Sequence, residues 1–120
     1  MLFRSPYGNG TSSDVYILKN NGSASFSSSF ITVNTVVYGF STGDFDADGD
    51  VDIAVVSSSS SDGSKYFFLF NNGSGNFTVS SKTNVNSPSA PYGVTTIDFD
   101  NDNDLDIAVS GDDKIGRAHV

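Results

Sequence analysis

The sequence predicts an all-β fold made of repeated four-stranded antiparallel sheets, and three observations support this. Val, Ile, Phe and Tyr fill the apolar positions while Ser, Gly, Asn and Thr fill the polar ones, a mixture that favours short strands and turns. No window shows a sustained helical period. Two segments also occur twice, each at a spacing of roughly 50 residues, and such a period with short strands is typical of a β-propeller or a similar array.

The first repeated segment is a nine-residue acidic loop. Its copies are DFDADGDVD, residues 44–52, and DFDNDNDLD, residues 98–106, which lie 54 residues apart (98 − 44). Both copies are preceded by a Tyr-Gly pair and followed by Ile-Ala-Val. The second repeated segment is an Asn-Asn-Gly-Ser turn with its flanks, residues 18–26 and 69–77, at an offset of 51 (71 − 20).

One repeat unit is expected to form four strands in order. The first strand enters the acidic loop, the second leaves it, Asp62-Gly63 turns the chain into the third, and the Asn-Gly turn leads into the fourth. The expected ranges are 35–42, 52–57, 66–70 and 77–81. The third strand, with the sequence YFFLF, is expected to be buried on both faces.

The phase of the repeat predicts the organisation of the chain. We expect the outer half of a blade in residues 1–34, a complete blade in 35–86 and the inner half of the next blade in 87–113. These add up to about two blades, and closing a ring takes at least about four. The chain is therefore interpreted as a fragment of a longer β-propeller.

The last residues are interpreted as a non-native tail. Ile115–Val120 matches the translation of a widely used short-read sequencing adapter, and we exclude residues 114–120 from the fold. The only histidine of the chain, His119, lies in this tail. We therefore expect no histidine-dependent active site in the native part.

The acidic residues concentrate in the two loops. All 14 are Asp, ten of them lie in the loops, and the formal net charge is −8. Carboxylates at loop positions 1, 3, 5 and 9 can converge on one point, where they repel one another unless a cation lies between them. Asp oxygens at this spacing suit Ca²⁺. Gly49 at position 6 permits a positive φ, and Asn103 at the same position of the second loop tolerates it at modest cost.

Other interpretations of the loops fit less well. An EF-hand needs a Glu at position 12, where this chain has Val55 and Val109, and dockerin-type loops fail for the same reason. Merely solvated turns would not keep one spacing in both copies. Paired Asp residues could perform acid–base chemistry, but they are better explained as metal ligands, and we expect no enzyme. Phe45 and Phe99, at loop position 2, are expected to plug the core.

Composition also excludes several partners. The chain has no basic patch to neutralise phosphates, so we expect no nucleic-acid partner. No stretch is long and apolar enough to be a transmembrane segment, and no signal peptide is visible. The chain contains no cysteine, so disulfides and thiolate chemistry do not enter.

The duplicated loop, the Tyr-Gly before it and the Asn-Asn-Gly-Ser-Gly-Asn-Phe hairpin resemble the FG-GAP and VCBS repeats. These repeats form the Ca²⁺-binding β-propellers of integrin α-subunits and of many secreted bacterial proteins. The resemblance covers about residues 14–113. The Gly-Ala-Pro of the family is replaced by Val56-Ser57-Ser58 and Ser110-Gly111-Asp112, so the chain is more similar to the VCBS type, and integrin-like ligand binding is not carried over.

The resemblance also implies a ligand set for each loop. Four Asp side chains and one backbone carbonyl would bind each Ca²⁺. In the first loop these are Asp44, Asp46, Asp48 and Asp52, with the carbonyl of Asp50; in the second they are Asp98, Asp100, Asp102 and Asp106, with the carbonyl of Asp104.

The function implied by the resemblance is that of a calcium-binding repeat in a secreted or cell-surface protein, serving as an interaction or adhesion scaffold. The propeller loops would then bind a protein or a glycan. One alternative is a lectin-like glycan-binding propeller, which an aromatic-lined pocket between blades would favour. Another is an accessory propeller of an extracellular hydrolase or lyase, which a catalytic domain in the same polypeptide would favour.

Overall fold

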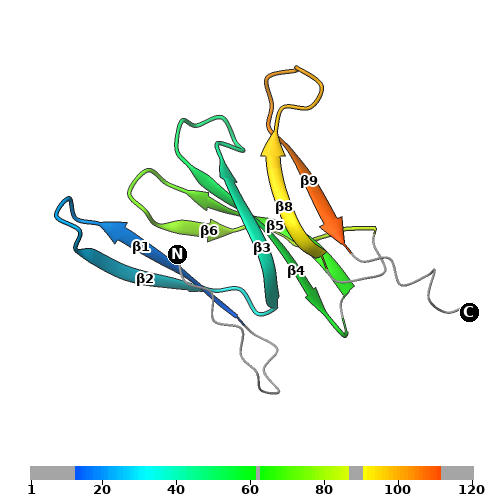
Figure 1. Ribbon diagram of the computed structural model, residues 1–120, viewed down its shortest axis with the longest axis horizontal. Coiled ribbons are helices and arrows are strands. Elements are labelled where there is room, and N and C mark those ends of the chain that lie inside the picture. The colour runs from blue at the N-terminus through cyan, green and yellow to red at the C-terminus, as the bar shows by residue number, and fades with distance from the viewer. Residues whose placement is uncertain (1–12, 62, 87–90, 112–120) are drawn as a thin grey trace, which may run out of the picture. The chain divides into compact units, whose positions relative to one another are not determined.

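The structure is a computed structural model that describes residues 13–61, 63–86 and 91–111. Within these ranges the chain forms nine strands, β1 to β9, and no helix (Figure 1). The all-β prediction is confirmed. The chain divides into two compact units, residues 1–36 and 37–120, which are described separately. The predicted Asp62 turn position and the predicted tail, residues 114–120, lie outside the described residues.

The first unit contains one antiparallel hairpin. β1 (Asp14–Asn20) pairs with β2 (Phe26–Thr32), from Asp14 opposite Thr32 to Asn20 opposite Phe26. The turn is closed by the Asn21 amide, which donates to the Ser25 carbonyl at 2.8 Å. Gly22 (φ 92°) and Ala24 (φ 55°) supply the left-handed positions that the turn needs.

The second unit contains a sheet whose main strands correspond to the four that the sequence predicts for one repeat, and this sheet is called the blade below. Its sheet has the order β3-β4-β5-β6, the four strands that the sequence places in one repeat (Figure 1). Their bounds are Val36–Gly43, Asp52–Ser59, Gly63–Asn71 and Phe77–Val79. A short strand that the sequence did not predict, β7 (Thr83–Asn84), also pairs with β5.

The centre of this blade is the pairing of β4 with β5. Ile53 lies opposite Leu69 and Val55 opposite Phe67, and all four side chains are buried. Opposite residues of an antiparallel pair share a face, so one face of β5 is fully covered. The other face carries Tyr66, Phe68 and Phe70, which stay half-buried. The expectation that this strand is buried on both faces is therefore correct for one face only.

A second, two-stranded sheet follows in the same unit. β8 (Pro91–Ile97) pairs antiparallel with β9 (Asp106–Gly111), with Val94 opposite Val109 and Thr96 opposite Ile107. The two sheets of the unit meet along β3, β4 and β8: the hydroxyls of Ser41 and Thr96 are 2.8 Å apart, and β4 contacts β8. β8 and β9 flank the second acidic loop in the same way that β3 and β4 flank the first.

Candidate metal sites

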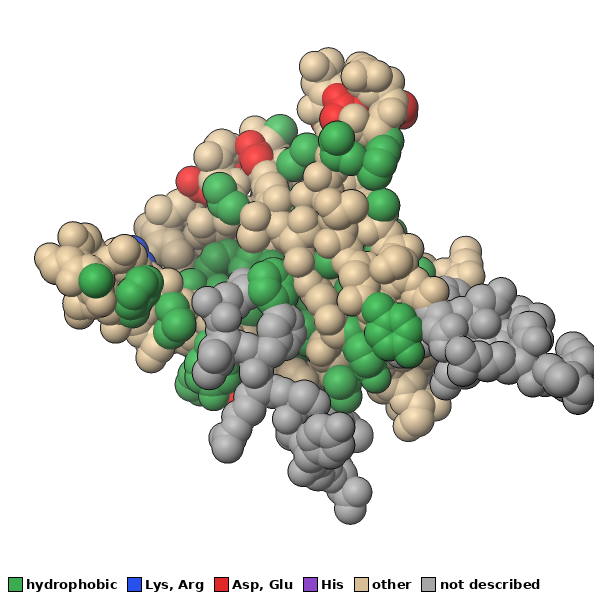
Figure 2. Space-filling view, in the orientation of Figure 1, with side chains coloured by type: hydrophobic (Ala, Val, Ile, Leu, Met, Phe, Trp, Pro, Cys, Tyr) green, Lys and Arg blue, Asp and Glu red, His purple; other side chains and the backbone are tan. Residues whose placement is uncertain are grey.

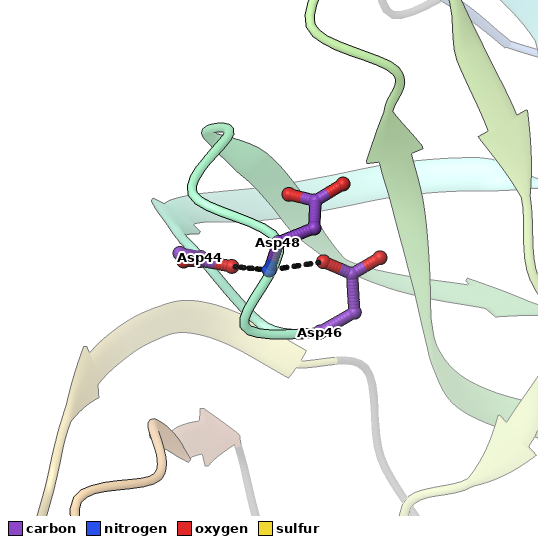
Figure 3. A group of neighbouring side chains, drawn as sticks. All are labelled: Asp44, Asp46 and Asp48. Atoms are coloured by element: carbon purple, nitrogen blue, oxygen red, sulfur yellow. Dashed lines mark hydrogen bonds between the residues drawn. The ribbon is translucent and has the colours of Figure 1, made fainter.

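The first acidic loop joins β3 to β4 and is held by its own carboxylates. The Asp48 amide donates to Asp44 Oδ1 at 3.2 Å and to Asp46 Oδ1 at 3.3 Å (Figure 3). The Gly49 amide donates to Asp44 Oδ2 at 3.0 Å, and the Asp50 amide to Asp48 Oδ1 at 2.9 Å. The loop therefore curls around its carboxylates, because short Asp side chains reach the amides two to five residues ahead.

The second loop, between β8 and β9, repeats these hydrogen bonds atom for atom at the offset of 54. The Asp102 amide donates to Asp98 Oδ1 at 3.2 Å and to Asp100 Oδ1 at 3.3 Å. The Asn103 amide donates to Asp98 Oδ2 at 3.0 Å, and the Asp104 amide to Asp102 Oδ1 at 2.9 Å. The two loops therefore share one conformation, although their sequences differ at positions 4, 6 and 8.

The backbone explains which residues the loop accepts. Position 6 is left-handed in both copies, with φ of 93° at Gly49 and 75° at Asn103, as the sequence predicts. Position 4 is also left-handed, with φ of 60° at Ala47 and 63° at Asn101. The sequence analysis missed this second constraint. The signal for it was weak, since only Asn101 belongs to a residue type that favours this region.

Position 9 anchors each loop. Asp52 is fully buried; its Oδ2 accepts a hydrogen bond from the Phe45 amide at 3.0 Å and its Oδ1 accepts one from the Asn71 amide at 2.8 Å. It thereby ties the loop to the end of β5. Asp106 Oδ2 accepts the equivalent bond from the Phe99 amide at 2.9 Å. Position 9 therefore has a structural role that the sequence analysis did not assign.

Three carboxylates in each loop come close enough to share one ion. In the first loop Asp44, Asp46 and Asp48 each place one oxygen within 4.8 Å of the others. In the second loop Asp98, Asp100 and Asp106 do the same. Oxygens that bind one Ca²⁺ at about 2.5 Å lie at most about 5 Å apart, so both groups fit a Ca²⁺ ion.

The other predicted ligands lie outside these two groups. Asp52 and Asp102 belong to neither group, although each accepts a loop amide, as Asp48 and Asp106 inside the groups also do. The Asp50 side chain lies against the β5–β6 turn, where a Cβ added to Gly73 would be 2.6 Å from Asp50 Oδ2. The side chain of Asp104 is exposed. For Asp50 this placement is compatible with a contribution through the backbone carbonyl.

The repeated loop geometry corresponds to a known family. Residues 44–109, which include both loops, match the family model of the FG-GAP-like repeat. The chain belongs to the FG-GAP-like repeat family. The match covers more than half of the chain and confirms the predicted resemblance to FG-GAP-type repeats. Together with the antiparallel sheets, it also confirms the predicted fold class, an all-β fragment of a β-propeller. No curated protein and no solved structure matches the chain. Among the described residues, no helix could cross a membrane.

The electrostatics of this FG-GAP-like repeat are dominated by the two loops. In the face shown in Figure 2, the acidic side chains gather at two protruding ends of the second unit. Partial desolvation within the loop, followed by repulsion from Asp48 and Asp52, raises the pKa of Asp46 above its ordinary value. A nearby cation would remove this repulsion.

The two phenylalanines at loop position 2 of the FG-GAP-like repeat differ. Phe45 is half-buried and packs on Phe68 of β5, with ring centroids 4.9 Å apart. Phe99 is 57% exposed. The expectation that both plug the core is therefore wrong for Phe99, because in the described residues no third strand lies beside β9 to cover it.

Proposed function

We propose that the protein is a calcium-binding β-propeller repeat of a secreted or cell-surface protein, and that it serves as a non-enzymatic interaction scaffold. The observation that carries this proposal is the duplicated loop: the same backbone-to-carboxylate hydrogen bonds recur in both copies, and in each copy three carboxylates come within 4.8 Å of one another. Such a cluster is costly without a cation, because like charges a few ångströms apart repel strongly in a protein surface. Ca²⁺ supplies the compensating charge and accepts several Asp oxygens in a flexible loop.

In this proposal the ion stabilises the connection between the first and second strands of each blade. Asp44, Asp46 and Asp48 would hold it in the first loop, and Asp98, Asp100 and Asp106 in the second. The Asp52 carboxylate would hold the first loop in place through the hydrogen bonds that it accepts from the Phe45 and Asn71 amides. With the loops rigid, the remaining surface can present a defined shape to a protein or glycan partner.

A lectin function is less well supported. An apolar groove in the second unit is lined by the aromatic residues Tyr66 and Phe68 together with apolar residues of β9. Its polar side-chain groups are the Tyr66 hydroxyl and Asp106, whose Oδ2 already accepts the Phe99 amide. Glycan recognition needs several convergent polar groups, so this groove favours an apolar occupant. An accessory role beside a hydrolase or lyase would require a catalytic domain elsewhere in the polypeptide.

Isothermal titration calorimetry with Ca²⁺ and Mg²⁺ tests the metal proposal. We expect Ca²⁺ to bind with a Kd of roughly 10⁻⁴–10⁻³ M and more tightly than Mg²⁺, which demands a smaller octahedral shell. Asp46→Asn and Asp100→Asn should each abolish or weaken one site. Asp14→Asn is the matched control, because it removes the same charge from β1, outside both loops, where Asp14 Oδ1 accepts the Thr32 hydroxyl. Absence of Ca²⁺ binding, or tighter Mg²⁺ binding, would contradict the proposal.

A further inference from the structure

The two acidic loops follow strands that lie side by side in the second unit. β3 leads into the first loop and β8 into the second, and the two strands are neighbours in Figure 1. A Cβ built on Gly39 of β3 would lie 3.6 Å from Val94 Cγ1 of β8. Nearer the loops, the Thr96 hydroxyl donates to the Thr42 carbonyl at 3.2 Å. Each of these two threonines stands two residues before position 1 of its loop, so the two loops begin close together.

A closer contact connects the second loop to the residue that precedes the first. That residue is Gly43, and a Cβ built on it would overlap Leu105 Cδ1, at position 8 of the second loop. The loop conformation does not demand a glycine here, because Ile97 occupies the equivalent position before the second loop, which forms the same hydrogen bonds. The φ of Gly43 is also not positive. Its lack of a side chain is therefore explained by the close approach of Leu105.

Apolar side chains extend this contact into a cluster that the two loops share. Phe45, at position 2 of the first loop, places its Cζ atom 3.6 Å from the same Cβ position on Gly43. Phe45 also packs on Phe68, and Phe68 lines the same groove as Leu105. The cluster thus contains one side chain from each acidic loop, Phe45 and Leu105.

Both of these side chains are adjacent in sequence to candidate metal ligands. Phe45 lies between Asp44 and Asp46, and Leu105 directly precedes Asp106. Repulsion between the carboxylates of an empty loop favours a more open loop, whereas a bound cation holds the carboxylates together. A loop that opens at its ligands also moves the apolar side chain beside them. The contact between the loops is therefore complete only when both loops are closed.

We propose, on the basis of the proposed calcium-binding function, that the two acidic loops form one cooperative unit. A Ca²⁺ ion bound in either loop raises the affinity of the other loop through the contact of Leu105 with Gly43. An ion that closes one loop puts its half of the contact in place, so closing the other loop gains packing that it would not gain alone. The effect is reciprocal, because the coupling free energy between two binding sites is the same in both directions.

Calorimetric titration of the 120-residue chain with Ca²⁺ measures this coupling. A bound ion also cancels part of the charge that attracts the second ion, so the titration is made at about 0.15 M ionic strength, where charges more than about 8 Å apart are largely screened. Asp100→Asn leaves only the first site and Asp46→Asn only the second, and each variant gives the Kd of one loop alone. In the unsubstituted chain the second ion should bind at least about fivefold more tightly than these two constants predict for independent sites.

Truncation of the contact should remove this factor. In Leu105→Ala, with both single-site constants measured again in that background, the two sites should be independent. Leu105 is 38% exposed, so its truncation leaves no closed cavity. Val51→Ala is the matched control, because Val51 holds position 8 of the first loop and is 59% exposed; it should keep the factor.

The possible outcomes separate the coupling from calcium binding itself. Independent sites in the unsubstituted chain, binding of one ion only, or equal factors in Leu105→Ala and Val51→Ala would overturn the coupling while calcium binding stands. A chain that binds no Ca²⁺ would overturn both proposals.

A metal-free measurement tests the contact without any ion. Gly43→Ala places a methyl group where Leu105 lies, so it should lower the Tm in chelator. In Leu105→Ala that space is empty, and adding Gly43→Ala there should lower the Tm far less, because substitutions at residues in contact are not additive. Differential scanning fluorimetry of the four proteins makes this comparison. Additive changes in Tm would show that the two residues do not touch and would overturn the proposed route of coupling.

Discussion

Left-handed backbone at two positions of each acidic loop restricts which side chains the loop can carry. Gly49 has a φ of 93°, and a Cβ there would meet no atom within 4 Å, so Gly49→Ala tests the backbone alone. We expect a loss of about 1 kcal/mol in unfolding free energy, because the left-handed region disfavours a Cβ. Urea denaturation in saturating Ca²⁺ measures it. A neutral Gly49→Ala would show that the loop does not need a positive φ at position 6.

Reciprocal substitutions in the same loops provide the control. Ala47 and Asn103 occupy left-handed positions with side chains, so Ala47→Gly and Asn103→Gly should relieve strain. Glycine also increases the entropy of the unfolded chain, so the expected gain is below about 1 kcal/mol. If both substitutions destabilise the protein by as much as Gly49→Ala does, the strain argument fails.

Protonation of Asp46 makes the loop sensitive to pH. Its pKa is raised in the folded, metal-free protein, first by partial desolvation and then by repulsion from Asp48 and Asp52. A carboxyl whose folded pKa lies above its unfolded pKa lowers stability as pH rises through the folded value, because the folded state holds the proton more tightly. Without Ca²⁺, the contribution of Asp46 to the free energy of unfolding should therefore decrease as pH rises above the ordinary Asp pKa.

In the presence of Ca²⁺, this loss of stability with rising pH should be reversed, because the ion binds the ionised carboxylate and displaces the proton. We expect Ca²⁺ affinity to fall as pH drops into the range where Asp46 protonates, with proton release on binding. Calorimetry in two buffers of different ionisation enthalpy detects the released protons. Asp46→Asn should remove part of the release, and an unchanged release would contradict the assignment.

At the scale of elements, one buried carboxylate connects the acidic loop to the third strand of the blade. Asp52 accepts the Phe45 and Asn71 amides with its two oxygens. Asp52→Asn would turn an NH₂ group towards one of these donors and leave it unsatisfied. We expect a loss of about 1–3 kcal/mol in chelator, where metal binding does not contribute. Asp50→Asn is the control, since its carboxylate accepts no hydrogen bond among the described residues; equal losses would contradict the anchoring role.

Sequence reasoning recovered the strands of the blade because their signals are local. Alternating apolar residues and the Asn-Gly turn place β3 to β6 within a few residues of their observed bounds. β7 was missed, because two residues, Thr83 and Asn84, carry no periodicity and form a strand only where β5 offers an edge. The sequence likewise treated Asp52 as a ligand alone, because its bond to Asn71 joins residues that are distant along the chain.

For the whole molecule, charge should govern stability without metal. The formal net charge is −8, and ten of the acidic residues lie in the two loops. Raising the ionic strength from about 0.01 M to about 0.15 M shortens the Debye length from about 30 Å to about 8 Å. Because the shorter Debye length screens repulsion between the carboxylates, we expect NaCl to raise the Tm in chelator. We also expect NaCl to reduce the additional increase in Tm that Ca²⁺ produces.

The Asp46→Asn, Asp100→Asn double variant is the control for this salt effect. It removes one carboxylate from each converging group, so its Tm should respond less to NaCl in chelator. Differential scanning fluorimetry at matched protein concentration makes the comparison. A Tm that does not respond to salt, or an equal response in both proteins, would show that the loops do not dominate the electrostatics.

The sequence by itself determined the repeat, the strands of the blade, the acidic loops and the left-handed position 6, because each depends on neighbours within a few residues. Tertiary structure decided the rest. It placed Asp52 beneath its loop, separated Asp50 from the converging carboxylates, and left Phe99 exposed while Phe45 is covered by Phe68. The two phenylalanines occupy the same position of the same motif. They differ because burial depends on which strand lies beside them in space, and a local pattern carries no information about that strand.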